Sequence, residues 1–253
     1  MQMDIPQGWR LHGESLVSCT PFEALALPKE GRHVISLVGG GGKTTLLHYI
    51  AGCYADMGLC TAVMTTTRMG CPQDYCETIE ACRAHWAAGK YAAAGRRLEN
   101  GKFRAPQESV LRALLEEADI IVVEADGAHR RPLKFPGDNE PVILDETDIV
   151  IAVSGLDALG QMAGEVCHRM PEAEKLLSCD EAHIITPADV AAVLLSPMGG
   201  RKGVCGRTYI AALNKCDDAR RLSLGEEVLR LLKAGGMKRA ALTHFPMENR
   251  TGL

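Results

Sequence analysis

Val38-Gly39-Gly40-Gly41-Gly42-Lys43-Thr44-Thr45 is the stretch that decides the fold of this 253-residue chain. The apolar run at 34–38 leads into it and predicts a buried strand. The residues after it carry an apolar stripe at helical spacing, formed by Leu46, Leu47, Ile50, Ala51 and Tyr54. A strand, a glycine loop and a Lys-Thr pair at a helix start are the layout of a phosphate-binding loop. We therefore predict that this segment binds a nucleoside triphosphate.

The residues of this glycine loop have separate predicted roles. Glycines let backbone N–H groups approach phosphate oxygens, and the helix N-terminus adds its positive dipole end. The Lys43 ammonium would neutralise the terminal phosphates and act in catalysis, and the Thr44 hydroxyl would ligate Mg²⁺. The predicted nucleotide-binding residues of the loop are Gly39, Gly40, Gly41, Gly42, Lys43, Thr44 and Thr45.

The loop is a compact form of the motif, because Leu37 stands where the longer form Gly-x-x-x-x-Gly-Lys has its first glycine. The compact form resembles the loops of Mur-type ligases. It also resembles those of dimerising NTPases, although a signature lysine that some of these carry would fall at Val38. Such relatives often bind nucleotide across a dimer interface, which makes a homodimer one expectation. A dinucleotide-binding loop has no use for the Lys-Thr-Thr that follows, and a plain glycine turn is the remaining alternative.

Two carboxylates end a second apolar run. Residues 120–123, Ile-Ile-Val-Val, predict a strand covered on both faces, and Glu124 and Asp126 follow at its carboxyl end. Ligands bind at that edge of an open parallel sheet. We predict that Glu124 ligates Mg²⁺ and that Asp126 orients a water or substrate, although either acid could meet the metal. A strand that ends in a polar turn is the alternative.

Cationic and hydroxyl side chains could complete an anion site at the same sheet edge. The basic segment after Asp126 could clamp a second anion or form a solvated loop. A threonine run at 65–67 ends the strand predicted at 61–64 and could sense a phosphate, or simply reflect β-propensity. The candidate anion or substrate residues are Thr66, Thr67, Arg130, Arg131 and Lys134.

A candidate base-reading motif follows the strand predicted at 209–213. Asn214-Lys215-Cys216-Asp217 matches the Asn-Lys-x-Asp pattern of GTPases, in which Asp217 would accept from guanine, Lys215 would cover the ring and Asn214 would brace the loop. The motif is short, and a turn that caps the next helix through Asp217 or Asp218 is the alternative. GTP and ATP therefore both remain candidates.

The order of elements predicts an α/β fold. Strands at 33–38, 61–64, 120–123, 149–153, 209–213 and 240–244 alternate with helices at 43–57, 108–117, 187–195 and 219–234. This pattern predicts a doubly wound, mostly parallel sheet of the P-loop NTPase type in three α/β/α layers. We expect one domain over 1–253, with an irregular lead-in at 1–30, a short helix near 22–27, and a β-hairpin insertion at 91–105 that turns at 99–101.

Composition excludes several classes of function. The formal charge of −4 and 4% aromatic content give no basis for nucleic-acid binding. No apolar run reaches the about 18 residues of a membrane span, and the start of the chain lacks a signal-peptide pattern. We expect a cytoplasmic protein whose ten cysteines are free. One cluster, Cys71, Cys76, Cys82 and His85, could bind a metal or chalcogen or consist of ordinary thiols; its spacing is unlike that of structural zinc sites.

Together these segments resemble the YqeC family over about residues 34–218. The resemblance rests on the glycine loop, the threonine run, Val123-Glu124-Ala125-Asp126-Gly127-Ala128 with the basic residues up to Lys134, and shorter matches at 154–157, 168–169, 186–187 and 213–215. It implies a nucleotide-binding accessory protein that helps make or insert the selenium-containing cofactor of a molybdenum hydroxylase. The implied partners are that hydroxylase or its cofactor-assembly proteins.

Three functions follow as hypotheses. The first is a Mg²⁺-dependent NTPase that uses GTP or ATP in maturation of a selenium-dependent molybdenum hydroxylase. The second is a small-molecule kinase or a Mur-like ligase with an acyl-phosphate intermediate, motivated by the compact loop and the basic segment. The third is a nucleotide-dependent carrier that turns over little.

Overall fold

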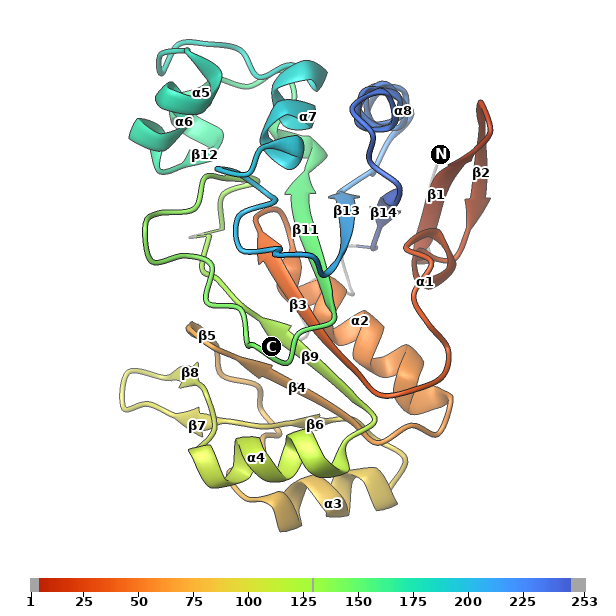
Figure 1. The fold of residues 1–253 in the computed structure, drawn as a ribbon, viewed down its shortest axis with the longest axis vertical. Helices are drawn as coiled ribbons and strands as arrows, with labels where there is room; N and C mark the ends of the chain where they lie inside the picture. Colours follow the sequence, from red (N-terminus) through yellow and green to blue (C-terminus); the bar gives the residue numbers. More distant parts are fainter. Residues whose placement is uncertain (1–4, 129, 247–253) are drawn as a thin grey trace.

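The computed structural model describes residues 5–128 and 130–246, and in them a nine-stranded sheet forms the centre (Figure 1). Its strand order is β2-β1-β14-β13-β11-β3-β9-β4-β6. The strands are β1 (Gln7–His12), β2 (Ser15–Cys19), β3 (His33–Gly39), β4 (Thr61–Thr65), β6 (Ala92–Ala93), β9 (Ile120–Glu124), β11 (Ile149–Gly155), β13 (Thr208–Asn214) and β14 (Ala240–His244). From β14 to β6 every neighbouring pair is parallel.

Helices cover both faces of this sheet. The helices are α1 (Pro21–Ala24), α2 (Lys43–Asp56), α3 (Ile79–Ala87), α4 (Glu108–Glu117), α5 (Ala163–Val166), α6 (Met170–Leu177), α7 (Pro187–Leu195) and α8 (Ala219–Ala234). Successive strand side chains point to opposite faces. On β3, Ile35 and Leu37 pack with α1 and α2 on one face of the sheet. On the other face, Val34 packs in a cluster with α3 and α4, and Val38 packs in a cluster with α7 and α8. This arrangement confirms the predicted three-layer α/β/α fold.

The strand order places the glycine loop where ligands bind in such sheets. From β3 the chain passes through α2 to β4 on one side, and the later strands β11, β13 and β14 extend the other side. The order therefore reverses at β3, and the crevice at the carboxyl ends of its strands is the expected ligand site. Glu124, at the end of β9, lies beside Leu37 of β3 in register.

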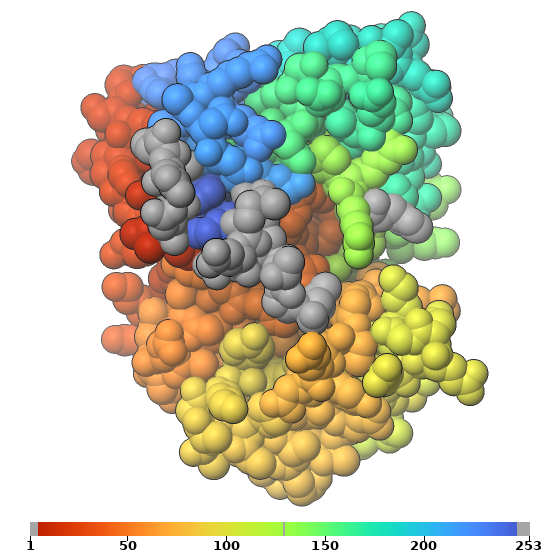
Figure 2. Space-filling model, turned by 180° about the vertical axis from the view of Figure 1, so that it is seen from behind, coloured from red at the N-terminus to blue at the C-terminus, as the bar shows by residue number. Residues whose placement is uncertain are grey.

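The first 30 residues depart from the expected irregular lead-in. β1 and β2 form an antiparallel hairpin, and β1 pairs with β14, so that N-terminal residues extend the sheet edge. Figure 1 shows this hairpin beside β14, and the space-filling view from behind shows the N-terminal and C-terminal segments side by side (Figure 2). The hairpin was missed because Leu16 and Val17 are adjacent between two serines in β2, so this edge strand shows no alternation of apolar and polar residues. The predicted helix at 22–27 is the shorter α1.

The region between β4 and β9 combines predicted and unpredicted elements. A hairpin of β7 (Arg96–Arg97) and β8 (Lys102–Arg104) confirms the predicted one in part, but residues 92–93 belong to the main sheet as β6. β5 (Arg68–Gly70) pairs with β8. Helix α3 was not predicted, because Cys82 is its one buried residue and no apolar stripe marks it. A further pair, β10 (Leu133–Lys134) and β12 (Cys167–His168), lies outside the main sheet.

Candidate functional site

The glycine loop is pressed against the end of β11. A Cβ added at Gly39 would lie 2.3 Å from the carbonyl oxygen of Val153, and one at Gly41 would lie 2.2 Å from the nitrogen of Gly155. Both glycines also have positive φ, +94° and +80°, a conformation that L side chains rarely adopt. The sequence therefore needs glycine at these positions for backbone approach as well as for the turn.

Hydrogen bonds hold the first part of the loop to its surroundings. The N–H of Gly39 donates to Asp126 Oδ2 at 2.9 Å, that of Gly40 to the carbonyl of Val153 at 2.8 Å, and that of Gly41 to the carbonyl of Arg131 at 3.2 Å. Helix α2 begins at Lys43. Its first hydrogen bond of the helical type, from an N–H to the carbonyl four residues earlier, runs from Leu46 N to Gly42 O at 3.2 Å. The N–H groups of residues 42–45 thus belong to the first turn, which has no intrahelical acceptors for them.

Asp126 sits between two lysines. Its Oδ1 lies 3.0 Å from Lys43 Nζ and its Oδ2 lies 3.1 Å from Lys134 Nζ. All three residues are at most 5% exposed. Lys43 Nζ also donates to the carbonyl of Gly39 at 2.5 Å. The contact at Oδ1 is an ion pair without hydrogen-bond alignment, since this oxygen has no hydrogen-bond partner in the described residues. The structure thus places the predicted catalytic pair, Lys43 and Asp126, in direct contact.

The ion pairs continue away from the loop. Lys134 Nζ also lies 2.9 Å from Glu140 Oε2, and Glu140 Oε1 lies 3.0 Å from Arg169 Nη2. Burial opposes ionisation of Glu140, but hydrogen bonds and charge from Lys134 and Arg169 outweigh it and lower its pKa. This series of ion pairs was not predicted from the sequence. Glu140 lies in a loop and Arg169 lies in a His-Arg pair 29 residues later, and no local pattern connects the two.

Glu124 lies against the helix start. Thr44 Oγ1 donates to Glu124 Oε2 at 2.8 Å, so the two predicted metal ligands are neighbours. Glu124 is 6% exposed. Burial raises its pKa, against the opposing effects of the Lys43 charge and the Thr44 hydrogen bond. A hydroxyl and a carboxylate at this distance are the hard oxygen donors that Mg²⁺ prefers.

The other candidate anion residues have partners elsewhere. Thr66 Oγ1 donates to the carbonyl of Val142 at 2.7 Å, and Thr67 N donates to Thr65 Oγ1 at 3.0 Å. Arg131 Nη1 donates to the carbonyl of Gly164 at 2.6 Å, and Arg130 is exposed. His129, which precedes them, lies outside the described residues. Of the basic segment, Lys134 is therefore the residue whose side chain reaches Asp126.

The segment at 214–217 contacts the loop through its asparagine. Asn214 Nδ2 donates to the carbonyl of Gly41 at 2.9 Å, and Thr243 Oγ1 donates to Asn214 Oδ1 at 3.1 Å. Asn214 therefore joins the end of β13 to the glycine loop and to β14. Lys215 Nζ pairs with Asp157 Oδ2 at 2.6 Å.

Asp217 is held on both carboxylate oxygens. Arg221 Nη1 contacts Oδ2 at 2.9 Å and His244 Nδ1 contacts Oδ1 at 2.8 Å. Asp218, not Asp217, caps α8 by accepting from Arg221 N at 2.8 Å. Neither Arg221 nor His244 was a predicted site residue, because both lie outside the four-residue motif.

Three other expectations can be compared with the described residues. Residues 5–128 and 130–246 contain no group of three or more His, Cys, Asp or Glu side chains that could hold a metal ion, and so Cys71, Cys76, Cys82 and His85 do not form such a group. All ten cysteines are free, as predicted. Within the same residues, no helix combines the length and apolar character that a bilayer span requires.

Comparison with known proteins identifies relatives. A family model described as "YqeC protein" matches residues 35–171, which contain the glycine loop, both acids, Lys134 and Arg169. A protein of Escherichia coli (strain K12) described as "Uncharacterized protein YqeC" is 30% identical over 210 residues, which cover 74% of this chain and 78% of that protein.

Proposed function

The chain belongs to the YqeC family, and we propose that it binds GTP or ATP with Mg²⁺ and hydrolyses it as an accessory protein in the maturation of a selenium-dependent molybdenum hydroxylase. One observation carries the nucleotide part. At the start of α2, Lys43 Nζ lies 3.0 Å from Asp126 and Thr44 Oγ1 lies 2.8 Å from Glu124. The two acids stand at the end of β9 and just after it. A cation and a hydroxyl at a helix N-terminus, facing two acids, are the parts that hold phosphates and a divalent ion.

The phosphate tail would bind at the first turn of α2. The loop amides of Gly39, Gly40 and Gly41 donate within the protein, so the amides available to phosphate are those of residues 42–45. Lys43 would exchange its contact with Asp126 for phosphate oxygens. Asp126 would stay in place through Lys134 and the N–H of Gly39, and could then orient a water.

Thr44 and Glu124 fit Mg²⁺, because both present oxygen donors and they lie 2.8 Å apart. When bound there, Mg²⁺ would neutralise charge on the phosphates. The base would lie toward residues 214–217, because Asn214 binds the carbonyl of Gly41. Guanine reading by Asp217 would require it to release Arg221 or His244.

A nucleotide-dependent carrier with little turnover is the second candidate. The carboxylate of Asp126 is engaged by Lys43, Lys134 and the N–H of Gly39. A carboxylate already held by two lysines and an N–H is less available to position an attacking water, which favours binding over hydrolysis. The kinase or ligase hypothesis has less support, because Arg130 is exposed and Arg131 is bound to Gly164.

The proposal extends to location and partners. We place the protein in the cytoplasm, either as one chain or as a homodimer that shares nucleotide. Its further partner would be the hydroxylase or a cofactor-assembly protein. Nucleotide-dependent co-purification of the hydroxylase, lost in a Lys43→Ala variant, is the expected sign of that partner.

Calorimetric titration of GTP and of ATP, each with Mg²⁺, tests nucleotide binding. A hydrogen bond to a charged group contributes about 1.5–3 kcal/mol, so Lys43→Ala should weaken binding roughly 10- to 150-fold. Lys90→Ala is the matched control, because it removes an exposed lysine away from the loop. Equal affinity of Lys43→Ala and wild type would refute the site. Asp217→Ala should abolish any preference for GTP.

Phosphate-release assays then separate the candidate functions. Turnover by the protein alone supports an NTPase, and tight binding without turnover supports a carrier. Turnover that begins only when a metabolite mixture is added supports a kinase or ligase.

A further inference from the structure

A second polar cluster lies away from the nucleotide site, at the start of α3. Cys76 precedes this helix, and Cys82 and His85 lie on it. Cys76 Sγ is 3.4 Å from His85 Nδ1, and His85 Nε2 is 3.1 Å from Asp74 Oδ2. Both cysteines belong to one buried cluster with residues of β4, β6 and α4. A sulfur, an imidazole and a carboxylate in series are the arrangement that activates a cysteine.

The surroundings of His85 favour its protonated form. Nδ1 faces both the carbonyl of Ala81 at 3.0 Å and the sulfur of Cys76, and Nε2 faces the carboxylate of Asp74. An imidazolium can donate from both nitrogens, whereas a neutral imidazole can donate from only one. The backbone hydrogen bond to Ala81, with help from Asp74, raises the pKa of His85 despite its partial burial.

The two cysteines have different roles in this cluster. The hydrogen bond from Cys82, with the nearby charge of His85, lowers the pKa of Cys76 to about 7 against the effect of burial. The same hydrogen bond raises the pKa of Cys82, which therefore stays protonated as the donor. Cys76 is the nucleophile of the pair and Cys82 is a neutral thiol next to it.

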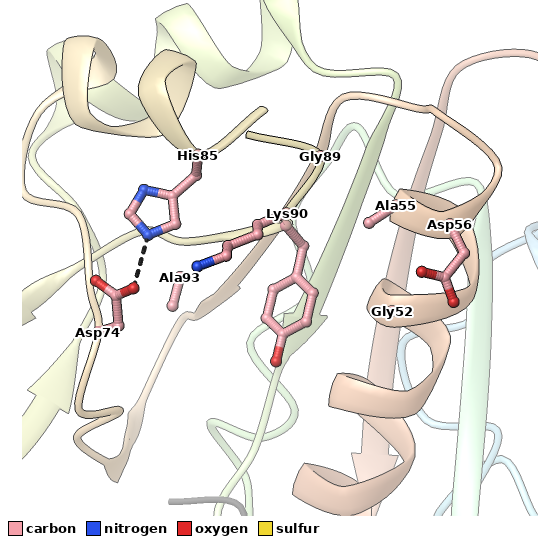
Figure 3. A pocket seen from close by; sticks show the side chains of 9 residues that line it. Gly52, Ala55, Asp56, Asp74, His85, Gly89, Lys90 and Ala93 are labelled. Atoms are coloured by element: carbon pink, nitrogen blue, oxygen red, sulfur yellow. Dashed lines mark ion pairs between the residues drawn. The ribbon is translucent and has the colours of Figure 1, made fainter. Parts of the chain in front are cut away.

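Access to this sulfur is narrow. Cys76 and Cys82 are both 0% exposed. His85 and Asp74 line a pocket between α2 and α3, together with Asp56, Lys90 and Tyr91, and Figure 3 shows His85 and Asp74 facing each other there. The sulfur of Cys76 thus lies one side chain from the pocket. A reactant must be small to pass His85, which excludes bulky disulfides.

We propose that Cys76 and Cys82 form an oxidation site for a small hydroperoxide, which converts them to a disulfide. The Cys76 thiolate attacks one peroxide oxygen, the O–O bond breaks, and the sulfur becomes a sulfenic acid. The departing alkoxide or hydroxide takes the proton held on His85 and leaves as alcohol or water. The Cys82 thiol then attacks the sulfenic sulfur, the S–S bond forms, and water leaves with the thiol proton. The hydroperoxide is the oxidant, and the two thiols are the reductant.

The backbone around Cys76 holds the sulfur in position for this chemistry. Cys76 N donates to Ala93 O at 2.8 Å and Gly95 N donates to Cys76 O at 2.9 Å, so the residue is tied to the sheet edge at β6. Cys82 lies on the first turns of α3. A disulfide would therefore fix the start of α3 to that edge. The site is independent of the nucleotide site, so either can fail without the other.

Peptide mass spectrometry of the full-length protein tests this site. The tryptic peptide 69–83 carries Cys71 as well as the pair, so the experiment uses a Cys71→Ser background. After hydrogen peroxide treatment and alkylation, this peptide should lack two hydrogens and carry no alkyl group. With Cys82→Ala added, Cys76 should stop at sulfenic acid and react with dimedone when the protein is unfolded in its presence.

The rate of disulfide formation tests the role of His85. Loss of the imidazolium should reduce the thiolate fraction of Cys76, so His85→Gln should slow the reaction several-fold, up to roughly tenfold. His12→Gln, the same substitution at an exposed position, should have no effect. Melting temperatures within a few degrees of wild type would show that the variants fold. Peroxide oxidation elsewhere in the chain with the pair still alkylated, or an unchanged rate in a folded His85→Gln, would overturn the inference.

Discussion

Replacement of Asp126 by Asn removes the charge that two buried lysines share. The carboxylate is 2% exposed and contacts Lys43, Lys134 and the N–H of Gly39. Asn has nearly the same shape but no charge. Lys134 would keep its pair with Glu140 at 2.9 Å, whereas Lys43 would keep only the carbonyl of Gly39. The variant therefore isolates the counter-charge of Lys43.

The expected loss of stability is large. Removal of one partner of a buried ion pair costs about 3–5 kcal/mol, and because Lys134 keeps Glu140 we expect the lower end, about 3 kcal/mol. In a chain of this size 1 kcal/mol shifts the melting temperature by about 2–4 °C, so thermal denaturation should show a drop of roughly 6–12 °C. Asp138→Asn, which changes an exposed aspartate in the loop that carries Glu140, should stay within about 0.5 kcal/mol of wild type.

Nucleotide makes the test specific to the proposed site. A bound phosphate would replace the missing anion beside Lys43, so GTP or ATP with Mg²⁺ should raise the melting temperature of Asp126→Asn more than that of wild type. A variant that melts like wild type would refute the role of Asp126 as counter-charge. A destabilised variant with no greater nucleotide response would show that Lys43 does not bind phosphate.

Three further changes have defined outcomes. Gly41→Ala should abolish nucleotide binding in calorimetry, because the new Cβ would meet the backbone of Gly155. Gly58→Ala is the control, because Gly58 also has a positive φ but open space around it; it should lower the free energy of unfolding by only about 1–2 kcal/mol in denaturant titration. The pKa of Glu140 is lowered in the folded protein, so its ionised form contributes stability above pH 4.5, the ordinary pKa of a glutamate. This contribution is lost as the pH falls through the lower pKa of the folded state. The loss of stability in Glu140→Gln, measured by thermal melting at several pH values, should therefore shrink below about pH 4.5. Thr186→Ala should cost about 1 kcal/mol by chemical denaturation, since Thr186 caps α7.

The elements that the sequence predicted best are those whose signals are local. Helices α4, α7 and α8 begin and end at the predicted residues, because an apolar stripe or a capping residue marks them. The β-branched runs of β9 and β11 identify central strands, since both faces of these strands are buried. The strand order around β3 was not predicted, because the alternation of strands and helices indicates parallel pairing but does not say which strands are neighbours.

Features that depend on tertiary contacts were not predictable in this way. Arg131 and Lys134 belong to one basic segment, yet Arg131 binds a carbonyl at Gly164 while Lys134 is buried against Asp126. The difference depends on β10, which turns Lys134 inward and pairs with β12. The same pairing brings β12, and Arg169 just after it, near this segment, so that Glu140 bridges Lys134 and Arg169.

The glycine loop is fixed by three segments that are distant in sequence, and this bears on how a ligand would bind. In the segment after β9, Asp126 accepts from Gly39 and Arg131 accepts from Gly41; Val153 of β11 accepts from Gly40, and Asn214 donates to Gly41. Backbone groups on both sides of the loop are therefore satisfied before any ligand arrives, which lowers the entropy lost when the loop is ordered. What must change is the side-chain pairing of Lys43 with Asp126, since both are buried and in contact. Binding should therefore exchange one anion for another at a preformed backbone, so that its affinity reflects the competition between phosphate and Asp126 for Lys43.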